Sequence, residues 1–285
     1  MIAPKPQRNN SFTARRERAV TLIAGIKSQS GLFLAADTEE QISGVLRTSG
    51  EKLHFINAPM ANWTIVLAGA GHVDYILMAR DLIQEKVTAG AGTSQEIVNA
   101  IRQSVQEIWR DYANHEGGAD LKLLIGSYCS DSASMFTVVS GAAVRTGRNV
   151  EAMGIGDATF RSLADRFLPI GHFSYVPGDR ESIVAFIVYA TLQAKLSVPG
   201  VGGMTRVVRI CPNGQIKWEK SFKIAAIQNF FHSLDQNIRN HCFRSFAQDK
   251  IETEVLLRSF SKATLRAFRE MRKEVKKIED DTRLV

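Results

Sequence analysis

Cysteine is scarce in this sequence, and the three cysteines that it contains are far apart: Cys129, Cys211 and Cys242. An odd number at these separations fits neither a disulfide framework nor the paired spacing of a structural zinc site. The six histidines show no metal-ligand spacing either. We therefore expect a reducing, cytoplasmic location, and we expect no metal ion or other cofactor.

Long hydrophobic runs are missing as well. No apolar run reaches the length of about 18 residues that a membrane-spanning helix needs. The N-terminus is basic, but it lacks the apolar stretch of a secretory signal peptide. The glycine-rich segment 200–203 has no phosphate-binding lysine beside it. These absences argue against a membrane partner and against a nucleotide site of the P-loop type.

A strong basic patch is the third feature that the folded part of the sequence lacks. The net charge of +7 and the pI of 9.4 suggest nucleic acid at first sight. However, residues 1–20 carry +4 of that charge, which leaves only +3 for the rest of the chain. Residues 1–20 also contain two prolines and no hydrophobic period. We therefore expect no nucleic-acid partner, and we interpret 1–20 as a disordered leader or as a start assigned too early.

The most informative stretch follows this leader. Two apolar runs, 21–27 and 31–37, flank a short polar break and predict a β-hairpin. A turn centred near Gln29 places Thr21 opposite Asp37, and a third short strand at 52–56 can bring Lys52 to the same end. A hydroxyl, a carboxylate and an ammonium group would then meet. The plainer alternative is a threonine that opens a strand beside an ordinary Asp37–Lys52 ion pair.

The remaining hydrophobic periodicities alternate between strands and helix pairs. A strand at 63–69 precedes helices at 72–87 and, after a capping box at 93–96, at 97–112. Strands are expected at 121–128, 135–140 and 150–153, helices at 157–167 and from 180 onward, and a final hairpin at 204–218. Two sheets packed face to face, with the helix pairs outside, would bury nearly every apolar run.

Beyond position 220 the pattern is helical, with apolar stripes at 224–238 and 256–278. We therefore divide the chain into the leader 1–20, a domain at 21–220 and a helical extension at 221–285. A narrow stripe on a long helix needs a partner surface. The extension is expected to pack on its own domain or, alternatively, on another subunit.

Several short motifs occur in an order that resembles the β-type subunits of the proteasome, which are N-terminal nucleophile hydrolases. The resemblance covers roughly 21 to 220, and its order and spacing are more specific than any one motif. The segments that carry it are Thr21 with Gly25-Ile26, Ala35-Ala36-Asp37, Gly50-Glu51-Lys52-Leu53, Val66–Gly71, Gly154-Ile155-Gly156 and Gly202-Gly203-Met204.

This resemblance implies an α+β fold of the four-layer αββα type and a homo-oligomer, with a ring as one form. It also implies a hydrolase of peptide or other amide bonds in which Thr21 is the nucleophile. Lys52 would then lower the pKa of the hydroxyl, Asp37 would orient Lys52, and the backbone N–H of Gly69 would bind the oxyanion. The α-amine of Thr21 would act as base, so the active form would begin at Thr21, by processing or by late initiation.

The chain departs from the family pattern at three places. Val20 stands where glycine usually precedes the threonine, and Asp157 stands where a serine usually follows the small-residue turn. Asp157 is a possible support of the site or simply a helix N-cap. The segment 198–201 lacks the usual aspartate and serine. A catalytically silent structural or assembly subunit and a small-molecule amidase therefore stay open as alternative functions.

Overall fold

The structure is a computed structural model in which eleven segments of the chain are described: 21–42, 46–56, 62–90, 92–112, 121–129, 132–139, 141–168, 175–239, 261–266, 268–273 and 275–276. Its elements run in the order β1 Leu22–Ser28, β2 Gly31–Asp37, β3 Glu39–Ile42, β4 Leu46–Ser49, β5 Leu53–Ile56, β6 Trp63–Gly71, α1 Val73–Thr88, α2 Ser94–Tyr112, β7 Leu121–Cys129, β8 Ser132–Val139, β9 Ala142–Arg145, β10 Val150–Gly154, α3 Asp157–Phe167, α4 Arg180–Ser197, β11 Thr205–Ile210, β12 Ile216–Trp218 and α5 Ser221–Ile238.

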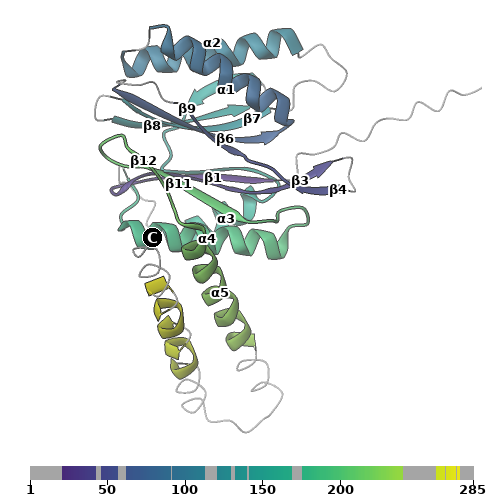
Figure 1. Cartoon of the computed structure of the whole chain (residues 1–285), viewed down its shortest axis with the longest axis vertical. Coiled ribbons are helices and arrows are strands. Elements are labelled where there is room, and N and C mark those ends of the chain that lie inside the picture. The colour runs from purple at the N-terminus through teal and green to yellow at the C-terminus, as the bar shows by residue number, and fades with distance from the viewer. Residues whose placement is uncertain are drawn as a thin grey trace, which may run out of the picture.

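Two five-stranded antiparallel sheets carry the fold. The first has the order β10-β1-β2-β11-β12, and the second has the order β5-β6-β7-β8-β9. The strands β3 and β4 form a separate two-stranded ribbon beside them. In Figure 1 the helices α1 and α2 cover the second sheet, while α3 and α4 lie across the outer face of the first.

Three clusters of buried apolar side chains separate these elements. One lies between the second sheet and α1 and α2, and it includes Phe136 and Ile101. Another lies between the two sheets and includes Leu34 and Leu124. The third, around Phe160, lies between the first sheet and α3, α4 and α5. Strands buried on both faces explain why β1 and β2 are continuous apolar runs rather than alternating ones.

The prediction of an α+β chain with two antiparallel sheets and helices is confirmed. Its finer form, the four-layer αββα sandwich, stays a prediction. The capping box is present, because Glu96 accepts hydrogen bonds from the backbone N–H groups of Gly92 and Thr93. The region 42–47 contains the end of β3 and the beginning of β4.

The predicted register of the first hairpin was wrong by one residue. Ile23 pairs with Ala36 and Ser28 pairs with Gly31, so the turn lies between Gln29 and Ser30 rather than on Gln29. Leu22 is therefore at the level of Asp37. Thr21 precedes the ladder, where the strand alternation no longer fixes its side chain. The hydroxyl can consequently still reach Asp37.

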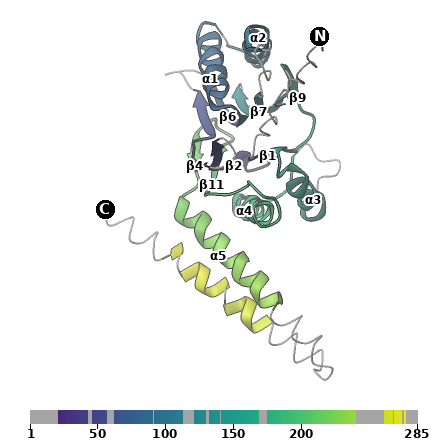
Figure 2. The same cartoon turned by 90° about the vertical axis from the view of Figure 1, so that its right-hand side faces the viewer.

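The helix α5 projects from the body of the fold, and a C-terminal helical segment at 261–276 lies beside it (Figure 2). The first turns of α5 add Ile224 and Ile227 to the core next to α4. In the apolar stripe 256–278, which was expected to pack on a partner surface, Met271 and Val275 are half-buried, while Phe260 and Ala267 lie outside the described residues. The leader 1–20 also lies outside them, so the division of the chain into 1–20, 21–220 and 221–285 stays a prediction.

Within the described segments, no helix is both long enough and apolar enough to cross a membrane.

Candidate active site

Thr21, Asp37 and Lys52 converge at one end of the first hairpin, as the sequence predicted. The Thr21 hydroxyl donates a hydrogen bond of 2.6 Å to Asp37 Oδ1 and accepts one of 2.5 Å from Lys52 Nζ. Lys52 Nζ is also 3.0 Å from Asp37 Oδ1. Only 3% of Thr21, 0% of Asp37 and 7% of Lys52 is exposed. Three polar groups are thus buried together and satisfy one another, as buried polar groups must.

The ammonium group of Lys52 is fully engaged by oxygen acceptors. An ammonium group has three N–H donors. In this site they have three acceptors, namely the Thr21 hydroxyl, the Asp37 carboxylate and the backbone carbonyl oxygen of Glu39. The positive charge is therefore fixed at hydrogen-bonding distance from the Thr21 oxygen. That is where an alkoxide would form if the hydroxyl lost its proton.

The carboxylate of Asp37 is held from several directions. Oδ1 accepts from Thr21, from Lys52 and from the backbone N–H of Leu22 at 2.9 Å. Oδ2 accepts from the backbone N–H of Gly202 at 3.1 Å. These donors come from the start of β1 and the residue before it, from Lys52 just before β5, and from the loop before β11. The carboxylate therefore cannot turn without breaking contacts to three parts of the fold.

The backbone of Thr21 is fixed by the turn that follows β10. Its carbonyl oxygen accepts a hydrogen bond of 2.9 Å from the N–H of Ile155. Gly154 has φ = +101°, and a Cβ at that position would lie 2.1 Å from the Thr21 carbonyl oxygen. Glycine is required at position 154 both by the positive φ and by the close approach of this backbone segment to the backbone of Thr21. The small-residue turn noticed in the sequence thus fixes the position of Thr21.

Lys195 is a further charged group of this site, and sequence reasoning missed it. It lies in the last turn of α4 and donates hydrogen bonds of 2.8 Å to the carbonyl oxygen of Gly203 and to the Thr205 hydroxyl. Burial lowers the pKa of Lys195 to about 8, although the nearby Asp37 and Glu39 carboxylates oppose that shift. The sequence did contain a signal for Lys195. The helical pattern places Ala194 on the buried face of α4, and Lys195 directly follows it.

Two residues expected at the site have other surroundings. The N–H of Gly69 donates to the carbonyl oxygen of Lys52 at 2.9 Å, so it is not available as an oxyanion donor. A Cβ on Gly69 would lie 2.5 Å from the Ile76 side chain, so this glycine permits α1 to pack on β6. Asp157 begins α3, whose N-cap is Gly156, and no hydrogen bond joins Asp157 to Thr21. The predictions for Gly69 as oxyanion donor and for Asp157 as N-cap were therefore wrong.

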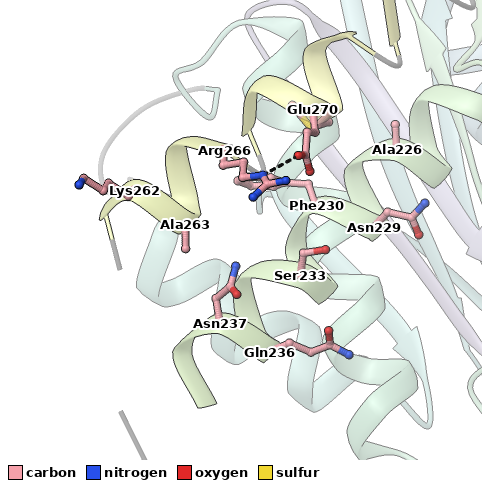
Figure 3. Close-up of a pocket in the computed structure, with 11 residues that line it drawn as sticks. Ala226, Asn229, Phe230, Ser233, Gln236, Asn237, Lys262, Ala263, Arg266 and Glu270 are labelled. Carbon is pink, nitrogen blue, oxygen red and sulfur yellow. Dashed lines mark hydrogen bonds and ion pairs between the residues drawn. The ribbon is translucent and has the colours of Figure 1, made fainter. Parts of the chain in front are cut away.

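Two cavities lie away from these groups, along α5 and the C-terminal helical segment. One, of about 560 Å³, is lined by amide and hydroxyl side chains of α5, such as Asn229, Ser233 and Gln236, and by Arg266, which is paired with Glu270 (Figure 3). The other, of about 1010 Å³, has aromatic walls that include Phe231. The Thr21 hydroxyl, in contrast, is buried and hydrogen-bonded to both a carboxylate and an ammonium group, so the Thr21 cluster remains the candidate active site.

No protein-family model and no curated protein sequence matches the chain. Solved structures of Anbu (ancestral beta-subunit) proteins do match its fold. The protein from Yersinia bercovieri is 15% identical with a TM-score of 0.63, and the match covers 80% of this chain and 97% of that one. Anbu from Hyphomicrobium sp. strain MC1 is 13% identical with a TM-score of 0.61, and the match covers 81% and 98%.

A third match is a structure that describes the helical assembly of the Anbu complex from Pseudomonas aeruginosa. It is 15% identical with a TM-score of 0.60, and the match covers 77% of this chain and 96% of that one. At such identities the likeness concerns the fold alone. The assignment to proteasome β-type subunits from sequence motifs is therefore corrected, since the fold is shared with the ancestral beta-subunit proteins called Anbu.

Proposed function

We propose that the chain is an N-terminal nucleophile hydrolase that cleaves amide bonds with the hydroxyl of Thr21. The observation that carries this proposal is the 2.5 Å hydrogen bond from a buried ammonium, Lys52 Nζ, to the Thr21 oxygen. An alkoxide at that oxygen would be stabilised by a positive charge inside a low-dielectric site. The likeness to Anbu proteins supports the proposal at the level of the fold.

The reaction follows from the roles of the groups at the site. With Thr21 as first residue, its neutral α-amine accepts the hydroxyl proton while the oxygen attacks the carbonyl carbon of the amide. The C–N bond of the tetrahedral intermediate then breaks, and the proton passes to the leaving amine. Water hydrolyses the resulting ester, which releases a carboxylic acid and restores the hydroxyl. Lys52 stabilises the negative oxygen of Thr21, and Asp37 keeps Lys52 in place.

Gly71 replaces Gly69 as the proposed oxyanion donor. Backbone N–H groups alternate in direction along a strand. Since the N–H of Gly69 points to Lys52, the N–H of Gly71 points to the same edge of β6, two residues further along. There β5 has not yet begun, and Gly71 has φ = +123° at the end of its strand. A substrate carbonyl lying beside Thr21 could accept a hydrogen bond from this group.

We further propose the four-layer αββα arrangement and a homo-oligomer. The first rests on the three apolar clusters, one between the sheets and one under each helix layer. The second rests on the helical assembly described for a protein of the same fold and on the projecting pair of α5 and the segment 261–276. Exposed Leu265 and Phe268 on that segment are candidates for a subunit contact.

The test uses a form that begins at Thr21, released from a fusion by a protease that leaves no extra residue. We expect this form to cleave amide substrates, and the form that retains residues 1–20 to be inactive because its Thr21 has no free amine. Profiling with peptides and with small acyl amides separates a peptidase from a small-molecule amidase. Absence of turnover and of covalent labelling in the form beginning at Thr21 would favour a silent structural subunit instead.

A further inference from the structure

We infer that Lys195 is a positioning residue of the Thr21 site, which fixes the loop at 200–203 and balances the charge of its two carboxylates. For its effect on rate, this inference rests on the proposed function; the arrangement of charges itself does not. The segment 198–201 lacks the aspartate and serine that are usual in the family pattern which the sequence motifs resemble. Lys195 supplies a polar group from a different element, α4.

The connection from Lys195 to the carboxylate runs through two adjacent residues. Lys195 Nζ donates to the carbonyl oxygen of Gly203 at 2.8 Å, and the N–H of Gly202 donates to Asp37 Oδ2 at 3.1 Å. Lys195 Nζ also donates to the hydroxyl of Thr205, which is directly opposite Asp37 in the pairing of β11 with β2. Both contacts restrain the backbone that holds the far oxygen of Asp37.

The hydrogen bonds distinguish this role from an ordinary helix-terminal lysine. A lysine in the last turn of a helix commonly interacts with the free carbonyl groups of that helix. Lys195 instead reaches the loop and the strand that follow, although even partial burial of an ammonium group is costly. Partly buried charges with specific partners are common at functional sites.

The charged groups that face Lys195 form a balanced set. The carboxylates of Asp37 and Glu39 raise its pKa, whereas Lys52 and burial lower it. Two acids and two lysines therefore compensate each other while both lysines are protonated. Loss of the Lys195 proton would leave an excess of one negative charge near Thr21. Negative charge there disfavours the developing alkoxide, so the rate of attack should fall as Lys195 deprotonates.

The experiment measures the rate at which the form beginning at Thr21 is acylated by a peptide β-lactone, from pH 6 to pH 10. The variants are K195M, K195R and, as the matched control, K217M, which removes an exposed lysine of β12. We expect K195M to be acylated about tenfold more slowly at pH 7, with melting close to that of the wild type. Deprotonation of the Thr21 α-amine raises the rate of every form over this pH range, so the informative quantity is the ratio of the wild-type rate to the K195R rate. K195R should restore the rate at pH 7, because arginine stays protonated, and the ratio of wild type to K195R should fall as pH rises through about 8. K217M should match the wild type.

A second measurement does not depend on activity. The titration of the Lys195 amine, followed by NMR on lysines labelled by reductive methylation, should lie near pH 8 and should move lower in E39Q, since Glu39 raises its pKa. A titration of the Lys195 amine near 10.5 that is the same in E39Q and in the wild type would overturn the proposed arrangement of charges. Wild-type acylation kinetics in K195M would overturn the positioning role. If no form is acylated, the proposed function fails, while the titration still decides whether the charges are coupled.

Discussion

Among the residues that the structure describes, two ion-paired carboxylates have side chains with 0% exposure, Asp37 and Glu219, and their surroundings differ. Glu219 accepts two hydrogen bonds from Arg180, at 2.9 and 2.7 Å, and lies 4.0 Å from Lys223. These contacts tie the start of α4 to the segment between β12 and α5, and the hydrogen bond to Glu219 raises the pKa of Arg180. Asp37 instead shares one oxygen between a hydroxyl and an ammonium group.

The difference separates a structural ion pair from the one that we propose to be reactive. The guanidinium group of Arg180 is a rigid fork that satisfies both oxygens of Glu219 and leaves no nucleophile in reach. At Asp37 the same kind of charge pairing includes the Thr21 oxygen, so loss of the Thr21 hydroxyl proton would leave an alkoxide next to Lys52. Variants at the two places should therefore separate loss of activity from loss of stability.

Replacing Thr21 itself should have the largest effect. T21A removes the proposed nucleophile, so the rate of amide cleavage should fall by at least about a thousandfold. T21S keeps a hydroxyl on the same backbone and should retain part of the activity. Steady-state cleavage by the forms beginning at residue 21 measures both. Equal rates for T21A and the wild type would place the chemistry elsewhere.

Removing the charge of either carboxylate should distinguish the two ion pairs. D37N leaves Lys52 buried without its counter-ion, which should lower the free energy of unfolding by about 3–5 kcal/mol and abolish labelling of Thr21. E219Q leaves a guanidinium group whose side chain is 39% exposed, so it should cost only about 1–3 kcal/mol and leave labelling intact. Urea unfolding and labelling rates report the two effects. Loss of labelling in E219Q with the fold retained would contradict the separation.

An alanine at Gly154 should separate loss of activity from loss of stability in a different way, because it displaces Thr21 without changing a charged group. Its Cβ would contact the Thr21 carbonyl oxygen, and a φ of +101° costs about 1–3 kcal/mol for an alanine. We expect G154A to lower labelling more than its loss of stability explains. G147A is the control, since a Cβ there meets nothing within 4 Å. Similar behaviour of the two variants, read by melting and labelling, would count against the fixed position of Thr21.

Substitutions in the projecting helices should have the smallest effect on the Thr21 site. Phe268 is 42% exposed and packs near Phe230 of α5, so F268S removes apolar surface from the proposed subunit contact. We predict a smaller assembly by light scattering, with labelling of Thr21 per chain changed less than about twofold. K262A, on the same segment, serves as the control. An unchanged assembly would favour packing of this segment on its own domain alone.

The apolar pattern was sufficient to predict most elements and the meeting of Thr21, Asp37 and Lys52. Runs such as 21–27 and 31–37 are buried on both faces, so they predict strands regardless of the exact register. The register itself depends on the turn, and the polar residues 28–30 allowed two turn positions. Thr21 still met Asp37 because it lies outside the ladder and its hydroxyl reaches the carboxylate across the strand end.

The rest depended on contacts between distant segments. The orientation of the Gly69 N–H is set by its pairing with Lys52, which a glycine motif does not indicate. Lys195 belongs to the site because α4 ends against the loop at 200–203, more than 150 residues along the chain from Asp37. Neither fact has a local signature in the sequence. Both concern which backbone groups are already hydrogen-bonded, and that is a property of the folded chain.

A Thr21 oxygen that is activated by its own amine and by Lys52 should form a covalent bond with an acylating inhibitor. The direct measurement is the mass of the form beginning at Thr21 after reaction with a peptide β-lactone, followed by peptide mapping of the modified residue. We predict one added acyl group, located on Thr21, and none in T21A or in the form that retains residues 1–20. Modification of another residue, or none at all in a correctly folded form beginning at Thr21, would contradict it.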